Sequence, residues 1–162
     1  MNATTLLLQQ HTVVRDLFSE YEKAEDGRAR RAIFMRIADN LAAHATIEEQ
    51  IFYPAAYQGD ELEDLLEEAV EEHLSMKRII ADLLDMSVTD PSFDAKVTVL
   101  REQVEHHVAE EEGELFPKIE HTLDRSELEE LGDEMETLFA EIMEDGPRHQ
   151  VPGETDRAAR LH

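Results

Sequence analysis

The sequence contains no cysteine, no long apolar run and few basic residues, and each absence narrows what the protein can be. Without cysteine, disulfide bonds and thiolate chemistry are excluded, and a reducing compartment is compatible with the chain. No run of about 18 apolar residues exists, so no membrane-spanning helix is expected. The N-terminus lacks a basic segment followed by an apolar stretch and a cleavage site, so no secretory signal is expected. These absences predict a cytoplasmic protein.

Basic residues are outnumbered, because 15 lysines and arginines face 39 aspartates and glutamates and give a formal net charge of −24. Such a charge argues against nucleic acid and against anionic membrane surfaces as partners. We interpret the acidity as a solvated surface that keeps the protein soluble. A basic protein partner is the alternative interpretation.

Helical periodicity, by contrast, runs through most of the chain. A length of 162 residues suffices for one domain with its own core. Apolar residues recur at helical spacing over four long segments, which are residues 4–25, 28–56, 61–85 and 93–120. Four long helices with short loops favour an all-α, up-down-up-down four-helix bundle.

A shorter fifth helix is expected to follow the bundle and to end near Glu144. Residues Ser126 to Glu129 have the pattern of a capping box at its start. The domain is therefore expected to cover residues 1–146. Residues 147–162 are polar, contain two prolines and show no periodicity, so we expect a loosely ordered tail.

Two segments of the chain are near-copies of each other, with the form His-x-x-x-Glu-Glu-x-x-aromatic-Pro. The first begins at His44 and contains Glu48, and the second begins at His107 and contains Glu111. Both the histidines and the glutamates are 63 residues apart. Residues four apart share one face of a helix, so each copy presents an imidazole beside a carboxylate in slots that the pattern assigns to apolar residues.

Two further histidines extend this repeat, since His11 lies 33 residues before His44 and His73 lies 34 before His107. In a bundle, the distance to a shared loop sets the height of a residue. From the loop near residue 27, His11 and His44 lie 16 and 17 residues away; from that near 59, His44 and His73 lie 15 and 14 away; from that near 90, His73 and His107 both lie 17 away. At about 1.5 Å per residue these mismatches are small, so the four imidazoles are expected in one layer.

Four imidazoles and two carboxylates at one level of an apolar core require a cation. A lone histidine on an apolar stripe is usually a core residue, but six such groups at one height are not explained that way. Six ligands are too many for a tetrahedral zinc site and suit two transition metals, each with two histidines and with Glu48 and Glu111 bridging. Solvent oxygen, as oxo or hydroxo, would complete the bridge. Iron is the leading candidate and manganese the second.

The arrangement resembles the hemerythrin-like, or HHE cation-binding, family over about residues 4–120. The resemblance implies a non-haem di-iron bundle whose ligands correspond to His11, His44, Glu48, His73, His107 and Glu111. Oxygen-carrying members have a fifth histidine four residues after the one that matches His73. This sequence has Lys77 there, which argues against reversible oxygen carriage and leaves the two metals more alike and more open.

Two other residues near the motifs carry open alternatives. Tyr53 stands where the second repeat has Phe116, and it is either a buried or capping residue or a metal ligand or hydrogen-bond donor beside the metals. Its spacing of five from Glu48 fits the ligand face poorly, although Pro54 could correct this by loosening the last turn. His106 points roughly 100° away from His107, so it either contacts the residues behind the ligands or lies on the surface. The remaining histidines are expected to face solvent; they are His121, His149 and His162.

The functional hypothesis is a soluble di-iron protein whose buried centre reacts with small oxidants, namely hydrogen peroxide, dioxygen or nitric oxide. Catalase-like removal of peroxide is the leading reaction. A non-catalytic module that binds or senses oxygen, nitric oxide or iron is the alternative, and oxygen storage is disfavoured by Lys77. The expected partner is a small molecule. The apolar residues Leu8, Phe52 and Phe139, assigned to outward faces, leave a monomer or a weak dimer open.

Overall fold

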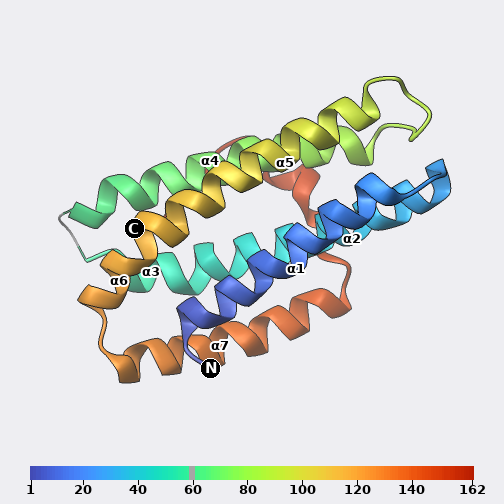
Figure 1. Cartoon of the computed structure of the whole chain (residues 1–162). Coiled ribbons are helices and arrows are strands. Elements are labelled where there is room, and N and C mark those ends of the chain that lie inside the picture. Colours follow the sequence, from blue (N-terminus) through green and yellow to red (C-terminus); the bar gives the residue numbers. More distant parts are fainter. Residues whose placement is uncertain (59–60) are drawn as a thin grey trace.

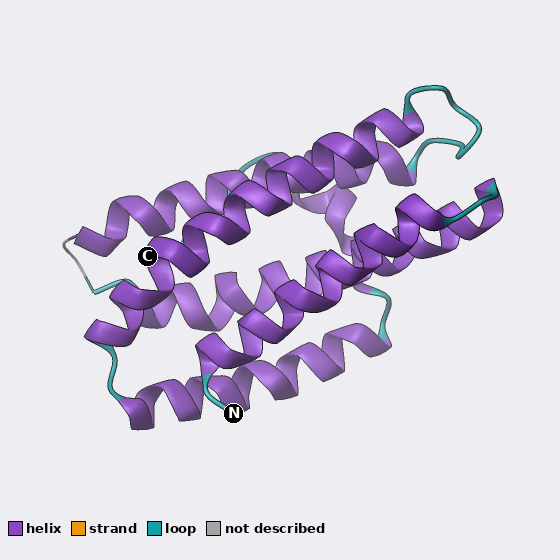
Figure 2. Ribbon diagram, viewed as in Figure 1, coloured by secondary structure: helices purple, strands orange, loops and turns teal. Residues whose placement is uncertain are grey.

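A computed structural model describes residues 1–58 and 61–162 of the chain, and all regular structure within these ranges is helical (Figure 2). Four long helices form the body of the molecule, namely α1 (Ala3–Lys23), α2 (Gly27–Ile47), α4 (Glu61–Leu84) and α5 (Phe93–Glu110). They run alternately up and down (Figure 1), which confirms the predicted helical bundle.

Side-chain caps explain where the first two helices begin. The Asn2 side chain accepts a hydrogen bond from the backbone N–H of Thr5, and Asp26 accepts one from Ala29. These acceptors satisfy backbone donors that the first turn of a helix leaves free. Asp26 therefore both ends the first helical pattern and starts the second. The expected break at residues 59–60 lies outside the described residues.

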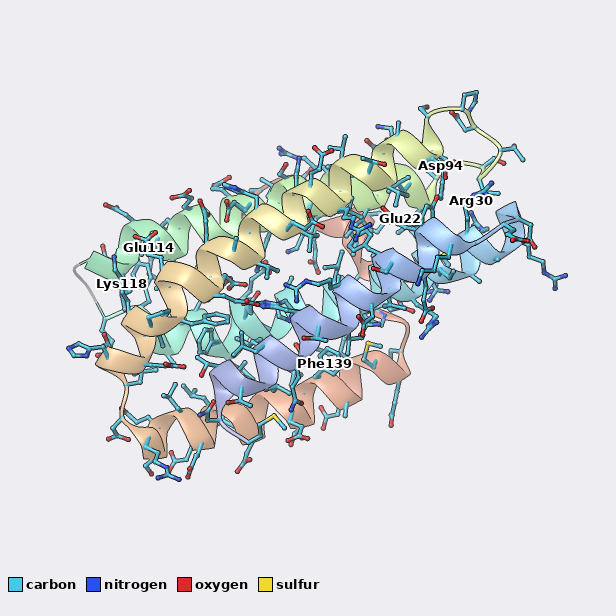
Figure 3. All side chains as sticks on the ribbon, viewed as in Figure 1. Glu22, Arg30, Asp94, Glu114, Lys118 and Phe139 are labelled. Carbon is cyan, nitrogen blue, oxygen red and sulfur yellow. The ribbon has the colours of Figure 1, made fainter. Side chains whose placement is uncertain are left out.

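The core consists of two apolar clusters, one on each side of the histidine level. One cluster includes Leu7, Phe52 and Leu66, and the other includes Phe18 and Phe34. At the far end of the second cluster, charged side chains close the bundle. There Arg30 lies 3.6 Å from Asp94, on the turn side of Figure 3. The polar layer therefore sits in the middle of the bundle, with apolar packing above and below it.

Two short helical segments extend each of α2 and α5. α2 continues into η1 (Glu48–Phe52), a π-helical turn, and then α3 (Tyr53–Ala56). α5 continues likewise into the π-helical η2 (Glu111–Leu115) and then α6 (Phe116–Thr122). The two long predicted segments are therefore each helical in three parts.

The fifth helix is present as α7 (Arg125–Glu144), which packs against α1 and α2 on the outside of the bundle (Figure 1). Its capping box is two residues earlier than predicted, because Asp124 and Glu127 exchange the two capping bonds. Phe139 is partly buried against the core (Figure 3). The outward placement of Phe52 was wrong, since its side chain is fully buried, whereas Leu8 is exposed.

The C-terminal tail differs from the expectation of loose order. Residues Pro147–Glu154 form η3, a 3-10 helix that contacts both α2 and α4, and Val151 is buried. Near the end of the chain, Leu161 is also buried. The α-helical period of 3.6 did not reveal this segment because a 3-10 helix repeats every three residues. Within the described ranges, no helix has the length and apolar character needed to cross a membrane.

Candidate metal centre

Two π-helical turns shape the segments that carry the glutamates. The backbone N–H of Tyr53 bonds to the carbonyl of Glu48, five residues earlier, and Phe116 bonds to Glu111 in the same way. The next residue in each copy is a proline, which lacks an N–H and would clash with the carbonyl four residues before it in a regular helix. The widened turn relieves that clash, so the predicted effect of Pro54 takes the form of a π turn.

The four histidines meet at one level of the bundle. The ring centroids of His11 and His44 are 4.9 Å apart, and those of His73 and His107 are 4.8 Å apart. The Nε2 atoms of His73 and His107 are separated by 3.2 Å. All four rings are buried. Counting residues from the shared loops thus placed these side chains at the right height.

Each buried glutamate lies between two of these imidazoles. Oε1 of Glu48 is 3.2 Å from Nε2 of His44 and 3.1 Å from Nε2 of His73. Oε1 of Glu111 is 3.3 Å from Nε2 of His11, and it is 3.2 Å from the corresponding atom of His107. Each carboxylate therefore joins a histidine of its own helix to a histidine of a neighbouring helix.

Several inward-facing atoms at this level have no well-aligned hydrogen-bond partner. They are Nε2 of His11 and His44, both carboxylate oxygens of Glu48, and Oε1 of Glu111. Leaving such atoms buried and unpaired costs free energy, so their convergence points to a cation. The donors also fall into two sets that could each hold a metal ion, Glu111 with His11 and His44, and Glu48 with His73 and His107. Mixed nitrogen and oxygen donors suit a first-row transition metal.

A hydrogen bond at Nδ1 orients each imidazole from behind. The acceptors are Glu112 for His11, Gln10 for His44, Glu49 for His73 and Glu72 for His107, at 2.7, 2.7, 2.7 and 2.8 Å. When Nδ1–H donates outward, the lone pair of Nε2 faces the centre, which is the tautomer that binds a metal. All four rings are thus held in a form ready for coordination.

Sequence reasoning missed these four acceptors, although the repeat carried a signal for them. Glu49 and Glu112 are the second glutamates of the two Glu-Glu pairs, while Gln10 and Glu72 directly precede the first histidine of each half. Each acceptor serves an imidazole on a different helix. Periodicity along one helix cannot reveal a partner on another, so only the doubling of the glutamates hinted at this role.

Charge complementarity is strong within the layer. Burial lowers the pKa of His107, but the carboxylates of Glu111 and Glu72 outweigh burial and leave the pKa well above the usual histidine range. Burial alone would raise the pKa of Glu111, whereas His107, Glu48 and His11 hold it well below the usual range. The protein therefore stabilises negative charge on Glu111, as a cation ligand requires.

Tyr53 reaches the centre from the π turn. Its hydroxyl donates to Oε2 of Glu111 at 2.6 Å and lies 3.5 Å from Nε2 of His73. The spacing of five from Glu48 fits the i to i+5 register of a π turn better than an α-helix. Burial and the nearby carboxylates of Glu111 and Glu48 raise the pKa of Tyr53 well above its ordinary value. In this geometry Tyr53 is a neutral hydrogen-bond donor, and ligation would require the loss of its proton.

Lys77, the residue that departs from the oxygen carriers, lies beside the centre without facing it as a donor of a lone pair. Its side chain is buried, and Nζ lies 3.0 Å from Oε1 of Glu49 and 3.1 Å from Oε1 of Glu154. Burial lowers the pKa of Lys77, but Glu49 and Glu154 outweigh it and raise the pKa. The side chain is therefore a cation that supports Glu49.

The remaining histidines lie outside the buried layer. Nε2 of His106 is 3.1 Å from Glu110 and 3.5 Å from Glu72, so His106 contacts the acceptor of His107 from the surface. These three side chains form a further, more exposed group with metal-ligand chemistry. The other three histidines, His121, His149 and His162, are exposed as expected.

Comparison with known proteins now adds to this geometry. Residues 2–119 match the hemerythrin HHE cation binding domain. The chain belongs to this family. The match covers the bundle and all six buried donors of the layer, so the family's description as a cation-binding domain agrees with the sets of unpaired donors.

A solved structure is similar to the whole hemerythrin-like chain. A hemerythrin HHE cation binding domain-containing protein from Mycobacterium kansasii aligns with a TM-score of 0.80 over 99% of this chain and 98% of that chain, with 24% identity. A curated protein described as a DNA nickase, from Nostoc sp. (strain PCC 7120 / SAG 25.82 / UTEX 2576), is 29% identical over 148 residues. That match covers 89% of this chain but 41% of the relative, so the chain spans about two fifths of the relative's length.

Proposed function

We propose that this hemerythrin-like chain is a non-haem di-iron protein that removes hydrogen peroxide. The six side chains that would hold the two ions are His11, His44, Glu48, His73, His107 and Glu111. The observation that carries the proposal is the set of buried, inward-facing nitrogen and oxygen atoms that lack protein partners. Iron suits their mixed donors, with manganese second.

The iron pair, when bound, supplies the redox chemistry by which two molecules of hydrogen peroxide become two of water and one of dioxygen. The protein's part is to orient and protect. The Nδ1 acceptors fix the imidazoles, and the apolar clusters on both sides exclude bulk water. Tyr53 Oη carries a proton at the level of the ligands, where a reacting oxygen could accept a hydrogen bond.

Peroxide removal is favoured over oxygen carriage by the nature of residue 77. Lys77 is held by two glutamates and offers no lone pair to a metal. The protein therefore has four buried histidines around the layer instead of the five ligands of an oxygen carrier, which leaves coordination positions for reactants. Oxygen storage would be supported instead by a reversible spectral change on cycling between air and vacuum.

The test is oxygen evolution from hydrogen peroxide by the iron-loaded protein. Wild type should evolve oxygen, whereas His44→Ala should lose iron and evolve none. His121→Ala, at an exposed position away from the layer, is the matched control and should behave as wild type. Equal oxygen evolution by an iron-free His44→Ala protein would assign the activity elsewhere.

A non-catalytic sensor of nitric oxide or oxygen is the second candidate, and the ordered C-terminal segment favours it. Glu154 of η3 pairs with Lys77, whose partner Glu49 bonds to His73, so the centre has a contact route to the outside of the bundle. A sensor would give a gas-dependent spectral change and a change in partner capture without turning over peroxide. Oxygen evolution distinguishes the two functions.

DNA cleavage, the activity in the name of the Nostoc relative, is disfavoured for this chain. The formal charge of −24 repels a phosphate backbone, and all six candidate ligands are buried. Incubation of the iron- or manganese-loaded protein with supercoiled plasmid should leave the plasmid intact. Nicking that disappears in His44→Ala would reverse this conclusion.

A further inference from the structure

A small cavity adjoins the four histidines of the layer. Its volume is about 40 Å³, and apolar side chains of all four long helices line it, among them Val14, Ala42, Met76 and Val104. A single water molecule needs about 10–15 Å³ measured in this way, so the cavity has room for a molecule of a few heavy atoms. We call this space the ligand chamber.

One wall of the ligand chamber comes from outside the family domain. Val151 lines the chamber, although the hemerythrin match ends at residue 119. The side chain is 1% exposed and belongs to the same apolar cluster as Val14 and Val104. It is carried by η3, which contacts both α2 and α4.

The period of η3 explains how one short segment can both line the chamber and hold on to the bundle. A 3-10 helix has three residues per turn, so Arg148, Val151 and Glu154 lie on one face. Arg148 binds Asp39 of α2 twice, through its backbone N–H at 3.0 Å and its guanidinium at 2.8 Å. Glu154 lies 3.1 Å from Lys77 of α4. Val151 is therefore held between two ionic anchors, one to each helix.

The second anchor also belongs to the surroundings of the centre. Lys77 lines the ligand chamber and lies 3.0 Å from Glu49, whose other oxygen accepts from Nδ1 of His73 at 2.7 Å. The same lysine thus connects the segment that walls the chamber to the residue that orients a candidate ligand. A displacement of η3 would remove one of the two carboxylates that hold Lys77 in place.

We propose that the C-terminal 3-10 segment closes the ligand chamber on the α2 and α4 side, and that Val151 determines the size of molecule that reaches the centre. The chamber admits neutral molecules of about two or three heavy atoms, such as hydrogen peroxide, dioxygen or nitric oxide, and excludes branched organic peroxides. This inference rests on the proposed function insofar as the chamber serves a metal centre that reacts with such molecules.

The test enlarges and fills the chamber at Val151. Val151→Ala should raise the rate with tert-butyl hydroperoxide relative to hydrogen peroxide by at least about tenfold in the iron-loaded protein, since a methylene-sized change in an apolar pocket discriminates by that much or more. Val151→Phe should slow the reaction with hydrogen peroxide. Val99→Ala, at a position 45% exposed, is the control and should leave the ratio unchanged.

A second measurement does not depend on turnover. Xenon binding, followed by NMR of the metal-loaded protein, should occur in wild type, strengthen in Val151→Ala and be lost in Val151→Phe, with iron content and optical spectrum unchanged. If wild type turns over neither peroxide, the proposed function fails while the xenon result still tests the wall. Unchanged xenon binding in both variants would overturn the inference, as would an unchanged ratio of rates in an active protein.

A separate variant tests the anchor. Arg148→Ala removes the guanidinium bond to Asp39 but leaves the chamber-lining side chains in place. It should shift the ratio of peroxide rates in the same direction as Val151→Ala and should speed the exchange of backbone amides in η3. Wild-type values for both measurements would contradict closure by this segment.

Discussion

At the scale of single residues, the groups behind the imidazoles distinguish the two halves of the repeat. The His107 ring donates to a carboxylate, Glu72, whereas the corresponding ring of His44 donates to a neutral amide, Gln10. A carboxylate acceptor raises the basicity of a ligating imidazole more than an amide does. The two halves are therefore alike in geometry but different in charge.

Removing one acceptor should weaken metal binding without touching a candidate ligand. We expect Glu112→Ala to lower iron affinity about 10–100-fold, because His11 loses the bond that fixes its tautomer and its orientation. Glu112→Gln should lose less, since the amide at Gln10 shows that a neutral acceptor can hold an imidazole here. Competition with a chelator of known affinity measures both values.

The matched control for that prediction lies two residues away. Glu114 is exposed, pairs with Lys118 one turn later (Figure 3) and makes no contact with the histidines. Glu114→Ala removes the same charge from the same π turn, so it should leave iron affinity at the wild-type value. Equal losses in both variants would mean that net charge, and not the bond to His11, controls affinity.

At the scale of elements, the π turn is what brings Tyr53 to the centre. Pro54→Ala supplies the missing N–H and removes the ring, so a regular α-helix becomes available to residues 48–56. In that helix Tyr53 would rotate roughly 100° away from Glu111. We expect Pro54→Ala to change the optical spectrum of the iron-loaded protein in the same way as Tyr53→Phe.

The double variant makes this expectation quantitative. If both changes act by removing the hydroxyl from Glu111, their effects on iron affinity should not add, because they break the same interaction. Pro117→Ala is the control, since the residue before Pro117 is Phe116, which has no hydroxyl to lose. Additive effects of Pro54→Ala and Tyr53→Phe would contradict the role given to the π turn.

The contact between α7 and the N-terminus tests the outer layer of the fold. A Cβ added at Gly132 would lie 2.0 Å from the backbone oxygen of Met1, so Gly132→Ala forces the two segments apart. Such overpacking should lower the free energy of unfolding by about 1–3 kcal/mol in urea titrations. Gly113→Ala meets no atom within 4 Å and should change it by less than about 1 kcal/mol, with a gain expected.

The sequence predicted those elements whose signal repeats with the period of an α-helix. The long helices and the height of the histidines followed from this period, since the rise per residue is fixed. The π turns did not, because each inserts one residue that the apolar stripe does not register. The segment around Val151 escaped for a related reason, as a single apolar residue in a 3-10 turn leaves no stripe. The acceptors at Nδ1 depend on contacts between helices, which local pattern cannot supply.

At the scale of the whole molecule, the bundle places a polar layer between two apolar clusters, and this arrangement is stable only if the layer is neutralised. The carboxylates of Glu48 and Glu111 are 0% and 1% exposed and face imidazoles whose inner nitrogens are unpaired in two of four cases. Without a cation, these atoms contribute an unfavourable burial term to folding. The metal ions should therefore be part of the folding free energy as well as of the chemistry.

Metal removal should accordingly lower stability by an amount set by affinity. At a free metal concentration 100 times the dissociation constant, one site adds about 2.7 kcal/mol. For a domain of this size that corresponds to a rise in Tm of about 5–10 °C per site. Thermal unfolding of the chelated and the iron-loaded protein measures the difference. His73→Ala should abolish most of it, because it removes a donor from the set around Glu48. If chelated and iron-loaded wild type melted at the same temperature, the layer would be neutralised by its own protons, and a resident metal would have no part in the fold.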